Sequence, residues 1–159
     1  MNGLWRWLPV VLWAWVIWDF SSSGFSSIQS SRFILPFLRW LLPQASAATL
    51  DVLHLLIRKS GHVAEYYILS LLLLRALAVT RGGWRLGAAL LALAIAAAYS
   101  GVDEIHQAFV PNRTASVWDS LLDTAAAALA QLTVWWWTKR GTRTPGRVAA
   151  GDATTSRSS

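Results

Sequence analysis

The sequence contains no cysteine and few charged residues. Without cysteine the chain can form neither disulfide bonds nor thiolate metal sites, and nothing indicates its redox compartment. Charged residues make up 14% of the 159 residues and apolar residues 55%, whereas a soluble domain has about 25% charged residues. The composition therefore departs from that of an ordinary soluble domain.

The formal net charge of the chain is +6, but the positions of its basic residues argue against nucleic-acid binding. Basic residues lie at the ends of apolar segments and in the C-terminal tail, and they form no stripe with interleaved aromatic residues. The eleven tryptophans flank several apolar segments, which is typical of the aromatic belts at membrane–water interfaces.

Four apolar stretches are long enough to cross a hydrocarbon core, which takes about 20 helical residues. They predict an all-α, four-span transmembrane helical bundle with spans at Leu4–Phe20, His62–Val79, Trp84–Gly101 and Val117–Trp137. The first stretch is longer than a typical signal-peptide core and no small-residue cleavage site follows it, so we expect a retained span.

Residues 21–61 fit neither a span nor a polar loop. Pro36, Arg39 and Pro43 interrupt the apolar runs, which predicts a broken interfacial or re-entrant segment between spans one and two. Helical spacing over 49–59 predicts a short helix leading into span two. Residues 1–137 thus form one transmembrane domain, and the basic, Gly/Ser/Thr-rich residues 138–159 predict a disordered cytoplasmic tail.

The distribution of basic residues predicts the orientation of the spans. Arg6 precedes span one, Arg81 and Arg85 lie between spans two and three, and Lys139 and Arg140 follow span four. Since positive residues mark the cytoplasmic side, we expect a multi-pass protein of the cytoplasmic membrane with both termini inside. This topology brings the outer ends of spans two, three and four to one depth.

The first polar block opens span two. Lys59, His62 and Glu65 are three residues apart and fall on one helix face, with Tyr66 beside them. Ionisable residues at membrane depth are costly and therefore functional candidates. The alternative is an interfacial helix start in which the helix dipole favours Glu65.

The second polar block follows span three and contains Asp103, Glu104, His106 and Gln107. Asp103 and His106 share a face if the stretch is helical, while Glu104 points elsewhere. A carboxylate–imidazole pair suits general acid/base chemistry or a divalent ion. The alternative is a solvated cap at the end of the span.

A third group of polar residues leads into span four. A turn-like link would direct Arg113 toward the second block for phosphate or carboxylate binding, and a structural salt bridge is the alternative. Ser116, Asp119 and Asp123 fall on one helix face, where Ser116 could instead be a helix cap. For Asp123, a functional role and a buried hydrogen bond to a neighbouring helix remain equally open.

These blocks resemble the sequence pattern of the VanZ-like family of small bacterial membrane proteins. The family pattern reads Arg-Lys-x-x-His-x-x-Glu-Tyr, then Asp-Glu-x-His-Gln-x-Phe-x-Pro-x-Arg, then Ser-x-x-Asp. The matching residues are Arg58, Lys59, His62, Glu65, Tyr66, Asp103, Glu104, His106, Gln107, Phe109, Pro111, Arg113, Ser116 and Asp119. Two positions depart from the pattern, Asp123 in place of Asn and Ala126 in place of Gly. The resemblance implies a cell-envelope role linked to reduced susceptibility to the lipid-tailed antibiotic teicoplanin.

Three classes of function remain open: an enzyme acting on an anionic envelope lipid or lipid-linked sugar, a non-catalytic binder of such a ligand, and a structural partner of another envelope protein. For the enzyme, the expected catalytic residues are His62, Glu65, Asp103, Glu104 and His106. The expected ligand-binding residues are Lys59, Tyr66, Gln107, Arg113, Ser116 and Asp119.

The imidazoles and carboxylates of this set could also hold Zn, Mn or Mg. Lys59 and Arg113 would oppose a divalent cation, so we expect a site without metal or cofactor. Membrane lipids are the expected partners, nucleic acid is not, and the sequence does not indicate an oligomeric state.

Overall fold

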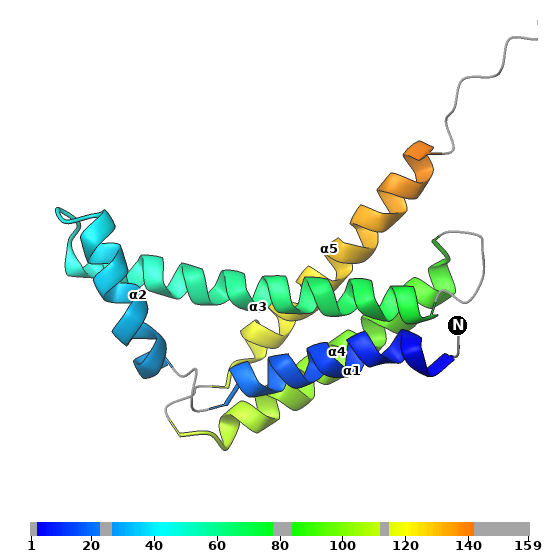
Figure 1. The fold of residues 1–159 in the computed structure, drawn as a ribbon, viewed down its shortest axis with the longest axis horizontal. Coiled ribbons are helices and arrows are strands. Elements are labelled where there is room, and N and C mark those ends of the chain that lie inside the picture. Colours follow the sequence, from blue (N-terminus) through cyan, green and yellow to red (C-terminus); the bar gives the residue numbers. More distant parts are fainter. Residues whose placement is uncertain (1–2, 23–26, 78–83, 112–114, 142–159) are drawn as a thin grey trace, which may run out of the picture.

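The chain is all-helical in a computed structural model that describes residues 3–22, 27–77, 84–111 and 115–141 (Figure 1). Within these ranges the helices are α1 (Gly3–Phe20), α2 (Ser27–Leu41), α3 (Ala47–Leu77), α4 (Leu86–Ala108) and α5 (Val117–Gly141). The same ranges contain no strand, which confirms the all-α prediction.

Helix α3 is the centre of the fold and contacts each of the other four helices. Figure 1 shows α1 and α4 along its C-terminal half, α5 crossing it obliquely, and α2 against its N-terminal end. The helix predicted over 49–59 is the N-terminal part of α3, which continues into the predicted second span as one helix of 31 residues. No proline interrupts α3. Gly61 lies on the exposed side of this helix, where a glycine costs only about 1 kcal/mol and is tolerated.

The segment expected to be broken contains a regular helix. Helix α2 has 15 residues and continues through Pro36. Proline removes one backbone hydrogen bond from a helix interior, but Leu38 in the next turn is buried and α2 packs against α3. We infer that this packing keeps the helix continuous.

Helices α4 and α5 both extend beyond the predicted spans. Helix α4 continues past Gly101 to Ala108, so the second polar block lies in its last two turns and not in a loop. Helix α5 continues through Lys139 and Arg140 to Gly141, which places the start of the predicted tail in a helix. The rest of that tail, 142–159, lies outside the described residues.

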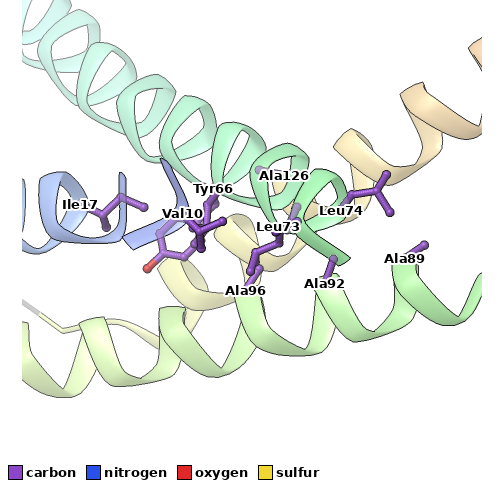
Figure 2. Packing of buried hydrophobic residues seen from close by; sticks show 12 residues of the cluster. Val10, Ile17, Tyr66, Leu73, Leu74, Ala89, Ala92, Ala96 and Ala126 are labelled. Atoms are coloured by element: carbon purple, nitrogen blue, oxygen red, sulfur yellow. The ribbon is translucent and has the colours of Figure 1, made fainter. Parts of the chain in front are cut away.

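The core consists largely of small side chains on α4 and α5 packed against larger ones on α1 and α3 (Figure 2). Ala92, Ala96 and Ala127 are fully buried, as is Tyr66. Small residues let helix backbones approach closely, as in membrane-helix packing. Many large apolar side chains lie on the outside instead, and α4 is the one helix of the described part that is long and apolar enough to cross a membrane.

Candidate functional site

Polar side chains of α3, α4 and the start of α5, together with Ser21 directly after α1, lie close together. Figure 1 shows that α1 and α4 end, and α5 begins, at this end of the helix packing. We call these residues the polar cluster. They are Ser21 directly after α1, Lys59, His62, Glu65 and Tyr66 on α3, Ser100, Asp103, Glu104 and Gln107 on α4, and Ser116, Asp119, Ser120 and Asp123 at the start of α5.

His62 lies between two carboxylates. Its Nδ1 atom is 3.7 Å from Oε2 of Glu65, one turn along α3, and 4.0 Å from Oδ1 of Asp123 on α5. These separations are ion-pair distances and too long for hydrogen bonds. The three side chains are only 15%, 14% and 1% exposed, respectively. An imidazole with two adjacent carboxylates can take up a proton, because both acids stabilise the imidazolium.

Asp103 joins α4 to α1. The side chain is fully buried, and its Oδ2 accepts hydrogen bonds from the Ser21 hydroxyl at 2.8 Å and from Nε2 of Gln107 at 2.9 Å. The same Gln107 nitrogen donates to the Ser21 hydroxyl at 3.3 Å. Because hydrogen bonds to a charged group are stronger than neutral ones, these contacts fix the carboxylate in place.

Asp123 joins α5 to α4. It is fully buried, and its Oδ2 accepts a hydrogen bond of 2.9 Å from the Ser100 hydroxyl, whose oxygen also lies 3.1 Å from the Ser120 hydroxyl. A hydroxyl has a single proton, so Ser120 donates to Ser100 when Ser100 donates to Asp123. Oδ1 has no hydrogen-bond partner within the described part of the chain and lies on the His62 side.

Two further contacts attach the start of α5. Glu104 accepts a hydrogen bond of 2.6 Å from the backbone N–H of Ser116, and Lys59 pairs with Asp119. Ser116 therefore takes part through its backbone at the helix start, close to the capping role that the sequence left open. Lys59 remains 35% exposed beside its partner.

His106 contacts α1. Its ring stacks on Trp18 with a centroid distance of 3.9 Å and an interplanar angle of 20°. Asp103 and His106 thus both face α1, as expected for a helical stretch, whereas Glu104 faces α5. This stacking places His106 beside Trp18, whereas His62 lies between the carboxylates.

Tyr66 lies at the inner boundary of the polar cluster, fully buried in the core (Figure 2). Its hydroxyl has no hydrogen-bond partner among the described residues. One turn deeper, Ser70 donates to the Ala127 carbonyl at 2.9 Å and lies 2.7 Å from Nε2 of Gln131. The polar contacts between α3 and α5 therefore continue into the apolar core.

The sequence did not single out Ser21, Ser100, Ser120 or Trp18. Ser21 lies in a serine-rich turn and Ser100 in an apolar span, where single serines are common. For Ser100 and Ser120 the one available sequence signal is helical spacing, since Ser100 lies three residues before Asp103 and Ser120 three before Asp123. Arg113 lies outside the described residues, so the structure does not place it.

The described polar cluster has more acidic than basic side chains. It contains five carboxylates, whereas its basic side chain is Lys59, with two histidines nearby. Within ranges 3–22, 27–77, 84–111 and 115–141, no three His, Asp or Glu side chains are arranged to hold a metal ion. A metal-free site stays a prediction.

Apolar helices around a buried polar cluster define the class of this molecule, an α-helical protein with the character of a membrane protein. A sequence model of the VanZ/LLP1 family matches residues 6–138, and the chain belongs to this family. This confirms the resemblance seen in the two polar blocks. No match was found among curated proteins or among solved structures.

Proposed function

We propose that the chain crosses the cytoplasmic membrane of a bacterium four times, through α1, the C-terminal half of α3, α4 and α5. Support comes from the large apolar side chains exposed on the outer faces of these helices, such as Leu12, Leu90, Leu121 and Leu132. A large exposed apolar patch on a protein surface marks a membrane or partner contact. Both termini then lie in the cytoplasm and the polar cluster at the outer leaflet.

The proposed function is binding of the polar headgroup of an anionic envelope lipid or a lipid-linked sugar, followed by proton transfer to or from it. The position of His62 between Glu65 and Asp123 carries this proposal. His62 acts as the base that takes a proton from a ligand hydroxyl, and the two carboxylates stabilise the imidazolium. Consistent with the family, this activity lowers susceptibility to lipoglycopeptide antibiotics.

The other predicted residues have supporting roles in this proposal. Lys59 and Arg113 attract the negative charge of the ligand, and Asp119 orients Lys59. Asp103, Gln107 and Ser21 hold α1 and α4 together at the base of the site. The residues at the edges of the site, which line it or orient its other side chains, are Tyr66, Glu104, Ser116 and His106.

Binding without turnover is the second candidate, and one observation favours it. The hydroxyls of Ser21, Ser100 and Ser120 form hydrogen bonds with a carboxylate, an amide or another serine. In these hydrogen bonds no imidazole is placed to activate the hydroxyl as a nucleophile. A binder would use the same charges to capture its ligand.

The test compares purified wild type with His62→Gln and Asp123→Asn by mass spectrometry of co-purified lipids. His54→Gln is the control, because His54 lies on the same helix but contacts Ser30 of α2. We expect an anionic lipid or lipid-linked sugar that is retained in the control and lost by at least tenfold in the two site variants. Equal lipid content in all four proteins would falsify headgroup binding.

Turnover and cellular assays separate the two candidates. If His62, Glu65 and Asp123 act as one catalytic unit, the double variants lose little more activity than the single ones. The readouts are conversion of the identified lipid in vitro and teicoplanin susceptibility on overexpression. Lipid binding without conversion would favour the binder.

A further inference from the structure

A groove opens between α4 and α5 next to the polar cluster. Its volume is about 360 Å³, and it is lined by Gly101, Glu104, Ile105, Ala108, Ala115, Ser116, Val117 and Ser120. This volume lies at the lower end of the range of about 300–1,000 Å³ for small-molecule sites. It suits one part of a lipid and not a whole lipid molecule.

The residues that line the groove form an apolar stretch and a polar corner. Ile105, Ala108 and Val117 supply apolar surface, and the exposed fractions of Ile105 (63%) and Val117 (77%) show that the groove opens outward. Trp118 and Leu121, which follow on α5, are exposed as well. In the proposed topology this outward face meets lipid chains, which are the apolar molecules available to fill it.

The polar corner is shared with the cluster. Glu104 lines the groove, is only 8% exposed, and accepts the hydrogen bond from the backbone of Ser116. Ser120 lines the groove too and contacts Ser100, which donates to Asp123 beside His62. A chain of hydrogen bonds therefore links the groove, through Ser120 and the buried Ser100, to the Asp123 carboxylate beside His62.

We infer that this groove holds the hydrocarbon chain of the lipid whose headgroup the polar cluster binds, an inference that rests on the proposed function. The ligand class is an amphiphile with a single chain in the groove and hydroxyl-bearing head atoms at Glu104 and Ser120. Lipid chains are as apolar as the groove, so chain binding adds little hydrophobic affinity. Its effect is to orient the headgroup toward His62 and to select the chain.

Gly101 provides a clean perturbation. A Cβ atom added at Gly101 meets no atom within 4 Å, and the same holds for Gly87 near the start of the same helix. Gly101→Leu therefore fills the groove without a backbone clash, and Gly87→Leu is the matched control outside the groove. Ala108→Phe, at an exposed groove position, is an independent second filling variant.

The experiment uses full-length protein in vesicles of phosphatidylethanolamine and phosphatidylglycerol with a trace of phosphatidylglycerol carrying a diazirine in one acyl chain. Photolabelled residues are mapped by mass spectrometry. We expect labelling of Ile105 and Val117 to exceed that of Leu90 and Leu91, exposed α4 residues that report bulk lipid contact, by at least fivefold. Both filling variants should abolish the excess, and Gly87→Leu should retain it.

The outcomes separate this inference from the proposed function. Two results would show that the groove is not a chain site. One is labelling at Ile105 no higher than at Leu90, and the other is an excess that survives Gly101→Leu and Ala108→Phe. If His62→Gln still removes the co-purified lipid in that case, the headgroup proposal stands alone. Loss of co-purified lipid in Gly101→Leu but not in Gly87→Leu supports both the groove as a chain site and the proposal of headgroup binding.

Discussion

Removal of the Ser21 hydroxyl tests the assembly of the polar cluster. Ser21 is 1% exposed, and its hydroxyl donates to the fully buried Asp103 carboxylate at 2.8 Å while accepting from Gln107 at 3.3 Å. Ser21→Ala deletes both contacts and hardly changes the volume of the side chain. The adjacent Ser22→Ala is the control, because the Ser22 hydroxyl donates to the Asp19 carbonyl at the end of its own helix.

The expected magnitude follows from the charge and burial of Asp103. A hydrogen bond to a charged group contributes about 1.5–3 kcal/mol in soluble proteins, whereas hydrogen bonds between membrane helices average about 0.6 kcal/mol and reach about 1.7 kcal/mol. With a buried carboxylate as acceptor, we expect Ser21→Ala to lower the free energy of unfolding by about 1–2 kcal/mol. This corresponds to a factor of roughly 5–30 in the folded-to-unfolded ratio.

The assay is reversible unfolding in detergent micelles, followed by the fluorescence of tryptophans such as Trp18, which stacks on His106 near this contact. Ser22→Ala should change the free energy of unfolding by less than about 0.5 kcal/mol, as is usual for surface substitutions. In an Asp103→Asn background the effect of Ser21→Ala should shrink, because the charge on the acceptor is gone. Equal destabilisation by Ser21→Ala and Ser22→Ala would refute the reasoning.

Three further predictions follow from packing, topology and charge. Ala96→Leu should destabilise the protein by about 1–3 kcal/mol through overpacking, whereas Ala98→Leu on the exposed face of the same helix should be nearly neutral in the same unfolding assay. A single cysteine at position Ser27 should react with an impermeant thiol reagent in intact cells and one at Gly83 should not; the reverse pattern contradicts the orientation. Burial holds the pKa of His54 below its ordinary value, so the protein binds fewer protons when α2 packs against α3 than when α2 is detached. The packing of α2 should therefore weaken as pH falls through about 6.5. The hydrogen-exchange protection factors of α2, which correct for the slower intrinsic exchange at low pH, should therefore be lower at pH 5 than at pH 7.5, and His54→Gln should remove that difference.

Local patterns in the sequence determined the helical class and the two polar blocks. The apolar stretches predicted α1 closely and the apolar parts of α4 and α5, because helix formation depends mainly on residue type and spacing within a few turns. The same local rules missed the continuity of α2, and they did not specify how the helix over 49–59 joins the span that begins at His62. A Ser-Gly pair and an internal proline weaken a helix by amounts that tertiary packing can offset, so neither fixes a helix end.

The membership of the site was decided only by tertiary structure. The hydrogen bond from Ser21 to Asp103 joins residues 82 positions apart, and the contact between His62 and Asp123 joins two helices. Such contacts depend on the rotation and crossing of packed helices, which one-dimensional spacing does not specify. The sequence therefore determined which titratable residues are present at this end of the helices, and the packing decided that His62 faces two carboxylates while His106 stacks on Trp18.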